Sequence, residues 1–169
     1  MPTMRRSGVR ALAAIAVAST LALSGCSVLF GAGADAQRDE EGNVTEDASI
    51  DIFALKVGDC MPVSEGEAEI SEASVVPCSS AHGEEVFFEF SAKDGDFPGR
   101  DAIMSEAETQ CTPAFESFVG ISYEESMLDW YPITPTEGTW ESLNDRVTQC
   151  VVYDPNNEEL VGSLEGAAR

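Results

Sequence analysis

The N-terminus of this chain determines which part of it folds and in which compartment. Arg5 and Arg6 precede an apolar run over residues 11–23, and the small residues Ser24 and Gly25 follow that run. A basic start, a short apolar segment and small residues at a cleavage point form the layout of a secretory signal peptide. The sequence therefore predicts that residues 1–25 are a signal peptide and that the remainder folds after export.

Cys26 makes this prediction more specific, because Leu23-Ser24-Gly25-Cys26 resembles a bacterial lipobox. In that motif the cysteine receives a diacylglyceryl group, cleavage occurs before it, and its new amine is usually acylated. Two readings compete: a cleaved signal peptide with a chance cysteine, and a transmembrane helix, although the apolar run is shorter than the roughly 20 residues that span a bilayer. Two or three acyl chains on Cys26 would hold the protein on the cell membrane, facing the extracytoplasmic side.

The charge of the chain excludes several classes of partner. The whole sequence carries 31 acidic and 9 basic residues, a net charge of −22. The signal peptide contains three of the arginines, so the remaining 144 residues carry 6 basic residues and a net charge of −25. Such a charge repels nucleic acids and anionic lipid headgroups. It is the charge of a solvated acidic surface or of a protein that selects a basic partner, and both readings stay open.

Four cysteines remain in the exported part, namely Cys60, Cys78, Cys111 and Cys150. An even number of cysteines in an exported domain predicts disulfides, and four cysteines allow three connectivities. We favour the most local pairing, Cys60–Cys78 and Cys111–Cys150, whose loops would stabilise the fold by about 3 and about 4 kcal/mol. Zinc is the competing reading, but no pair has the C-x-x-C spacing of a zinc site.

Residues 27–49 are small, polar and acidic, with almost no apolar pattern after Phe30. A segment of this composition buries too little apolar surface to fold. The sequence therefore predicts a disordered acidic tether over residues 26–49, with a reach of roughly 25–30 Å from the membrane. The folded extracytoplasmic domain is expected over residues 50–169.

Alternating apolar residues predict several short strands in this domain. The clearest runs from Glu84 to Phe90, with Val86, Phe88 and Phe90 expected on one face of the strand and Glu85, Phe87 and Glu89 on the other. Further strands are expected from residue 50, over 73–78, 127–133 and 147–153, and more weakly over 160–164.

One helix is expected between these strands, because Ile103, Ala107, Cys111, Phe115 and Phe118 recur every three or four residues. Pro113 is expected to kink or split the helix, and Gly120 to end it. The order of elements predicts an α+β fold, a small, mostly antiparallel sheet with one principal helix, stapled by two disulfides.

His82 is the only histidine and the first candidate for chemistry. It could act as a general base near Ser79 and Ser80, but a triad also needs a third group and an oxyanion hole. No nucleophile motif such as G-x-S-x-G is present. A structural role in the turn before Glu84 and Glu85 is the leading reading, with contact to a partner second.

Two tryptophans, a tyrosine and two prolines lie close together over residues 130–140. Such residues are enriched at binding surfaces but also fill cores. We therefore treat Trp130 and Trp140 as candidate partner contacts together with His82 and Glu85, and expect Trp140 to be the more exposed tryptophan. Asp154 begins an EF-hand-like spacing, but Glu159 stands where the loop needs glycine, so no metal site is predicted.

Several of these residues occur in a familiar order. Leu55-Lys56-Val57-Gly58-Asp59-Cys60, Val75-Val76-Pro77-Cys78 with His82 and Glu85-Val86-Phe87, Cys111 with Phe118-Val119-Gly120, Pro135-Thr136 with Trp140, and Asp145-Arg146 with Cys150 resemble the septum-formation domain family. The resemblance covers roughly residues 50–165. It implies an actinobacterial envelope protein linked to septation, and it implies no catalytic activity, cofactor or ligand. That family usually has W-x-x-G-x-R where Ser142-Leu143-Asn144-Asp145 fill the turn here.

The sequence as a whole predicts a lipid-anchored envelope domain, not an enzyme, that binds an unidentified envelope protein or cell-wall partner, with a role in septum formation. Two alternatives are a lipoprotein that binds a small ligand or cation, and an envelope hydrolase that uses His82 with a nearby carboxylate. The hydrolase reading requires His82 to be accessible in a cleft.

Overall fold

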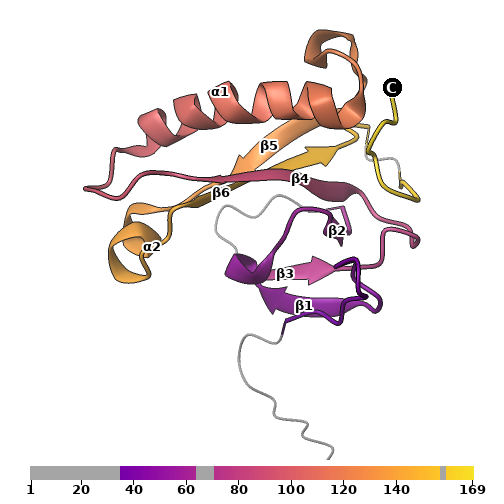
Figure 1. The fold of residues 1–169 in the computed structure, drawn as a ribbon, viewed down its shortest axis with the longest axis horizontal. Helices are drawn as coiled ribbons and strands as arrows, with labels where there is room; N and C mark the ends of the chain where they lie inside the picture. The colour runs from indigo at the N-terminus through magenta and orange to yellow at the C-terminus, as the bar shows by residue number, and fades with distance from the viewer. Residues whose placement is uncertain (1–34, 64–70, 157–158) are drawn as a thin grey trace, which may run out of the picture.

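A four-stranded antiparallel sheet forms the centre of the structure (Figure 1). The structure is a computed structural model, and it describes residues 35–63, 71–156 and 159–169. The strand order is β2-β4-β6-β5, in which β2 is Cys60–Met61, β4 is Glu84–Ser91, β5 is Asp129–Ile133 and β6 is Val147–Tyr153. The longest ladder joins β4 to β6. These strands confirm those expected over 84–90, 127–133 and 147–153.

Different layers cover the two faces of this sheet (Figure 1). Helix α1 (Arg100–Val119) packs on one face, where most of its buried residues join Phe87, Cys150 and Val152 in one core. On the other face lie β1 (Ala48–Asp51) and β3 (Glu72–Val75), which form a two-stranded sheet, and the short helix η1 (Ile52–Ala54). Val86 and Val151 face this second core. The predicted α+β class is confirmed, and the second small sheet extends it.

Both predicted disulfides are present, Cys60–Cys78 and Cys111–Cys150. Cys111 lies on the buried side of α1 and Cys150 on β6, so the second bond joins the helix to the sheet. The first bond joins β2 to the turn after β3. Each disulfide therefore joins two parts of the fold that do not pair with each other as neighbouring strands of one sheet.

A bulge in β4 changes the expected faces of that strand. Val86 pairs with Val151 and Phe88 pairs with Cys150, so Phe87 is an extra residue in the ladder. Beyond it the alternation is shifted, and Phe88 and Phe90 pack on the α1 side while Val86 faces the other core. The prediction that Val86, Phe88 and Phe90 share a face is wrong, because a bulged residue flips the alternation that follows it.

Pro113 was expected to kink or split the helix, and helix α1 continues through it, so the split is excluded. Pro113 lies on the exposed side of the helix, where the Thr109 carbonyl that loses its N–H partner can be hydrated. The predicted end is confirmed: Gly120 takes a left-handed φ of 91° and donates its N–H to the Glu116 carbonyl.

Three further differences concern segments with weak sequence patterns. Helix α2 (Glu137–Ser142) and the short η2 (Tyr123–Glu125) were not expected. The weak strand over 160–164 is absent, and only Leu160 makes an isolated bridge, to His82. Leu164 nevertheless packs beside α1, so the C-terminal residues 159–169 form a strap across that side of the fold. We call this segment the C-terminal strap.

The predicted tether is too long, because residues 35–49 pack against the domain. Ala36 and Val44 are buried in the core on the β1 side. The Arg38 side chain donates to Asp59, with Nη2 to Oδ2 at 2.9 Å, and the Arg38 and Val44 backbones form a bridge. The folded part therefore begins before residue 50, and the ion pair of Arg38 with Asp59 offsets the low apolar content of the segment.

The predicted signal peptide, Cys26 and the first part of the tether lie outside the described residues. Within the described ranges, no helix is both long and apolar enough to cross a membrane.

Candidate functional site

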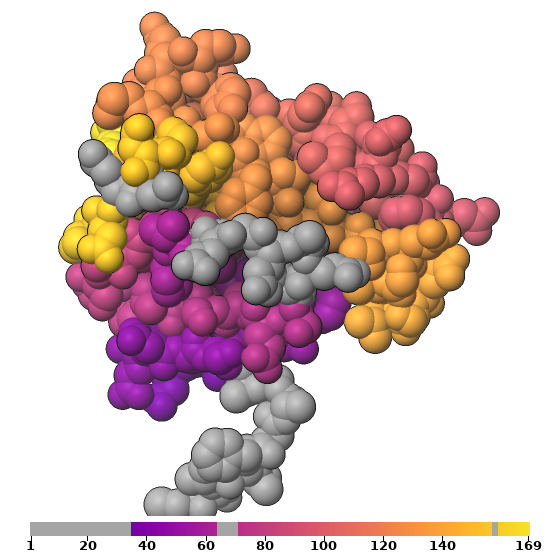
Figure 2. Space-filling model, turned by 180° about the vertical axis from the view of Figure 1, so that it is seen from behind, coloured from indigo at the N-terminus to yellow at the C-terminus, as the bar shows by residue number. Residues whose placement is uncertain are grey.

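A groove of about 720 Å³ lies where several elements meet at one end of the sheet. Its walls come from η1 and the turn after it, the first turns of α1 and α2, and strands β5 and β6, with Glu89 of β4. Figure 2 views the molecule from behind, with β5 and α2 in orange tones and the N-terminal strands in indigo to magenta below them. A volume of this size lies in the range of about 300–1,000 Å³ typical of ligand-binding sites.

The lining of the groove is mainly apolar. Phe53 is 51% exposed and Val147 is 40% exposed, although both are large hydrophobic residues. Tyr131 and Ile133 of β5 and Met104 of α1 are half-buried beside them. Large apolar side chains that stay exposed around one concavity indicate a binding surface, because isolated soluble domains rarely leave such groups together in water.

Trp140 fixes the wall that α2 contributes. Its ring is buried, its Nε1–H donates to the Gly95 carbonyl at 2.9 Å, and Phe97 meets it edge-on at 5.7 Å. The Arg146 guanidinium lies 3.8 Å from the ring centroid and donates to the Trp140 carbonyl. These contacts hold α2 against the loop before α1. The expectation that Trp140 is the more exposed tryptophan is therefore wrong, since Trp130 is half-buried.

Gln149 fixes the wall that η1 contributes. It is buried on β6, and its side-chain Nε2 donates to the Leu55 carbonyl at 2.8 Å. Lys56, which follows Leu55 in the chain, donates its backbone N–H to the Asp59 carboxylate. Arg38 binds the same carboxylate. The turn that carries Phe53 and Lys56 is thus tied both to the central sheet and to the N-terminal segment.

Strand β5 is an edge strand, and its start is fixed by Asp129. The Tyr123 hydroxyl donates to Asp129 at 2.6 Å, and this hydrogen bond, with burial and the charge of Asp129, raises the pKa of Tyr123 to about 12. The Trp130 N–H donates to the Asp129 side chain at 2.7 Å, and Pro132 has no N–H. The outer edge of β5 therefore offers no free N–H at these two positions, which prevents another strand from pairing there.

Five charged residues line the groove, and they differ in what they already bind. Lys56 pairs with the exposed Asp35 at 3.1 Å, and Asp145 accepts a hydrogen bond from the Thr139 hydroxyl. Glu137 stands in the first turn of α2, where the helix dipole favours an acid. Arg100 and Glu89 are exposed and form no ion pair with any described residue, including each other.

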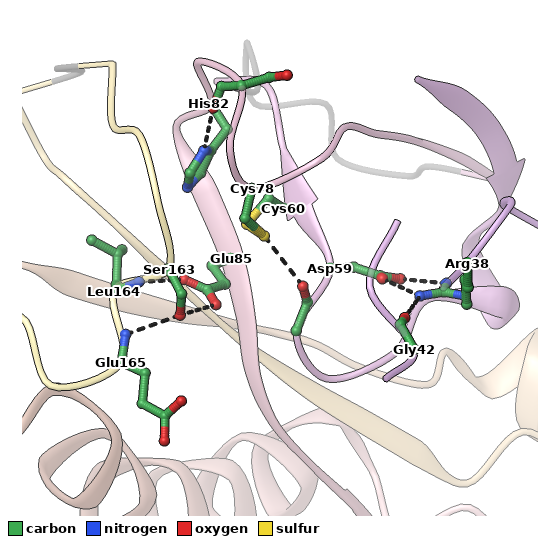
Figure 3. Close-up of a disulfide and its surroundings, with 12 residues drawn as sticks. Arg38, Gly42, Asp59, Cys60, Cys78, His82, Glu85, Ser163, Leu164 and Glu165 are labelled. Atoms are coloured by element: carbon green, nitrogen blue, oxygen red, sulfur yellow. Dashed lines mark hydrogen bonds and ion pairs between the residues drawn. A yellow bond between two sulfur atoms is a disulfide. The ribbon is translucent and has the colours of Figure 1, made fainter. Parts of the chain in front are cut away.

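His82 lies outside this groove and is buried, with 1% of its surface exposed (Figure 3). Its Nδ1 is 3.0 Å from the Ser80 carbonyl, and its backbone forms both hydrogen bonds of the bridge to Leu160. Its Nε2 is buried without a hydrogen-bond partner in the described part of the chain. The structure places His82 in the turn before β4, as the leading reading expects, and not in an accessible cleft.

Glu85 anchors the C-terminal strap. Its carboxylate is buried and accepts the Ser163 hydroxyl and the Leu164 N–H, each at 2.7 Å (Figure 3). Burial raises the pKa of Glu85 above its ordinary value of 4.5 and outweighs these hydrogen bonds and the charge of His82, which lower it. Neither Glu85 nor His82 therefore presents an exposed side chain to a partner in this state.

One cluster of potential metal ligands occurs among the described residues, formed by Cys60, Cys78 and Glu85. The two sulfurs are bonded to each other in a disulfide, so they are not available as thiolates. The EF-hand-like stretch does not form a cation site at its first position either. Asp154 is buried, binds Arg169 at 2.6 Å, and accepts the Asn156 N–H at 2.8 Å, while residues 157–158 lie outside the described ranges.

Comparison with known proteins gives a family match that spans most of the chain. Residues 26–169 match the protein family described as septum formation. The chain belongs to the septum-formation family. No curated protein and no solved structure matches it. The family description links this septum-formation protein to cell division and carries no indication of catalysis.

Several residues that carry the family resemblance lie in or beside the groove. Lys56, Thr136 and Asp145 line it, and Trp140 with Arg146 braces its α2 wall. The remaining residues of the pattern hold the fold together elsewhere, through the two disulfides and the turn of His82 and Glu85.

The groove was not expected from the sequence, since its residues come from five separate segments. Phe53 was the one sequence signal that pointed to this surface. It alternates with Ile50 and Ile52, so if they face the core, Phe53 is predicted to face solvent, where a large apolar residue is unusual.

Proposed function

We propose that this septum-formation protein is a lipid-anchored, extracytoplasmic binding domain, and that the groove receives an envelope protein or cell-wall partner during septation. The apolar lining, with Phe53 and Val147 exposed and Tyr131 half-buried beside them, is the observation that carries the proposal. Its walls are fixed by Trp140 and Gln149, so the surface is largely preformed. Preformed apolar concavities bind with less loss of conformational entropy.

A binding role is favoured over the hydrolase alternative by the position of His82. A general base must reach the proton of its nucleophile or substrate, directly or through one water. His82 is 1% exposed and its Nδ1 faces the Ser80 carbonyl, a group that cannot act as a nucleophile. The cation-binding alternative is not favoured by a specific observation, because Asp154 already binds Arg169.

The proposed anchor is a lipid on Cys26, and the matched family range begins at this residue. The negative charge of the chain disfavours direct binding to anionic headgroups, so the lipid supplies the attachment. We expect growing cells to incorporate an alkyne-labelled fatty acid into the protein and not into the Cys26→Ser variant. Absence of label from the wild-type protein, or equal labelling of both proteins, would contradict the lipid on Cys26 without bearing on the groove.

Live-cell imaging tests the groove. The C-terminal Ala168 N–H is bonded to the Val119 carbonyl, so a fluorescent protein must be joined through a long flexible linker. We expect the wild-type fusion to concentrate at midcell and the Phe53→Glu variant to spread evenly over the envelope. Met127→Glu is the matched control, because Met127 is 61% exposed and does not line the groove. Equal midcell enrichment of all three proteins would contradict a groove-mediated role.

A further inference from the structure

We propose that the groove binds an extended peptide segment whose apolar middle is flanked by two side chains of opposite charge. This inference rests on the proposed function and deepens it by naming the class of partner. Three features of the groove support it: its apolar walls, exposed unpaired charges of both signs in its lining, and the closed edge of β5.

The apolar walls fit side chains of a peptide. Phe53, Tyr131, Ile133 and Val147 come from three elements that line the groove, η1, β5 and β6. Phe53 and Val147 are large apolar residues that stay exposed. Burying such groups against a partner removes apolar surface from water, at roughly 25 cal/mol for each Å². Aromatic or proline side chains in the middle of the segment would contact them.

The rim charges fit a segment that carries both signs. Arg100 on α1 and Glu89 on β4 line the same groove, yet neither forms an ion pair within the described residues. A polyanion such as a nucleic acid would meet Glu89 and the net charge of −22. Glu137 of α2 also lines the groove, is exposed, and forms no ion pair within the described residues. The lining therefore offers free charges of both signs, which a peptide with one basic and one acidic side chain matches.

The edge of β5 determines how such a segment binds. Peptides often add a strand to an exposed sheet edge through backbone hydrogen bonds. On β5 the Trp130 N–H already donates to the Asp129 side chain, and Pro132 has no N–H. Strand addition therefore lacks backbone donors at these two positions. The segment must therefore be recognised through its side chains, which makes its flanking charges decisive for affinity.

The inference is tested with capped heptapeptides and the full chain labelled with ¹⁵N in mild detergent. The probes share the middle Ala-Phe-Pro-Phe-Ala and differ at their ends, which are Lys and Glu in either order, Lys twice, or Glu twice. Salt at about 150 mM limits the Debye length to about 8 Å and so screens attraction by the net charge. We expect one of the two mixed peptides to bind at least about threefold more tightly than both like-charged peptides, a difference of about 0.65 kcal/mol. Its amide shifts should be confined to groove residues such as Tyr131 and Val147.

Charge-neutral variants assign the two ends. Arg100→Gln and Glu89→Gln should each remove the preference for the mixed peptide, while the exposed controls Lys93→Gln and Glu108→Gln should retain it. Binding only of a like-charged peptide, equal binding of all four peptides, or no binding at millimolar concentration would each overturn the inference. The proposed function would survive these results if midcell enrichment still depended on Phe53, because the partner would then have a different chemistry.

Discussion

Asn144 adopts a left-handed backbone conformation, with φ of 55°, in the turn between α2 and β6. Asparagine is among the few residues other than glycine that tolerate this conformation. A residue with a larger or less adaptable side chain would therefore be strained at this position. The turn matters for the groove because it connects α2 to Asp145 and Arg146.

We expect Asn144→Ala to lower the free energy of unfolding by about 1 kcal/mol, because alanine disfavours left-handed φ. Asn144→Gly should be close to neutral, since glycine accepts the conformation but gains freedom when unfolded. Urea denaturation of the three proteins measures both effects. If Asn144→Gly destabilised as much as Asn144→Ala, the side chain of Asn144, and not its backbone conformation, would be what the turn requires.

Glu85 should give the protein a specific pH dependence. Its pKa is raised above 4.5 in the folded state, so the folded protein holds this proton more tightly than the unfolded chain does. Its contribution to stability is therefore full below the unfolded value and is lost as pH rises through the folded value. Asp154 acts in the opposite direction: burial raises its pKa, but hydrogen bonds from Asn156 and Arg169 prevail and lower it, so its contribution is lost as pH falls below 3.8.

The variant Glu85→Gln isolates the first effect, because glutamine keeps the shape and can still accept the Leu164 N–H. The free energy of unfolding of wild type minus that of Glu85→Gln should decrease as pH is raised from about 4 to about 7. Chemical denaturation at several pH values measures this difference. A difference that does not change with pH would show that Glu85 has the same pKa in both states.

At the scale of elements, the Cys111–Cys150 bond attaches α1 to β6. Its ends are separated by 39 positions in the sequence, so by loop entropy the bond stabilises the fold by about 4 kcal/mol. We expect Cys111→Ala with Cys150→Ala to lose about this amount in urea denaturation under oxidising conditions. Both positions are buried, and alanine avoids placing an unpaired hydroxyl there. The paired change Cys60→Ala with Cys78→Ala should lose less, about 3 kcal/mol. The reverse ranking would contradict the loop-entropy account.

The elements also show which parts of the fold a sequence determines locally. The strands β4 and β6, the body of α1 and its end at Gly120 follow periods of two or three to four residues, and these were predicted. The bulge at Phe87 was not predicted, because it depends on the pairing register between β4 and β6. Helix α2 is too short to show a period, and the contacts of Trp140 with Gly95 and Arg146 stabilise it. Residues 35–49 pack through Arg38, whose partner lies 21 positions away.

At the scale of the whole molecule, the groove forms only when the layers come together. Its walls combine the N-terminal layer at Phe53, the central sheet at Tyr131 and Val147, and helix α1 at Arg100. No sequence period brings these positions to one place, so the groove could not be predicted, although the disulfides and the α+β class could. Three of the candidate contacts chosen from the sequence are buried in the structure, where their contacts hold the fold together: His82, Glu85 and Trp140.

The most direct test of the groove is site-specific photo-crosslinking in dividing cells. A photoreactive phenylalanine analogue at Phe53 is compared with the same analogue at Met127, which is exposed outside the groove. We expect a discrete adduct from position 53 that position 127 does not give and that weakens in the Arg100→Gln and Glu89→Gln background. The same adducts from both positions, or no adduct from position 53, would contradict the claim that the groove is the binding site.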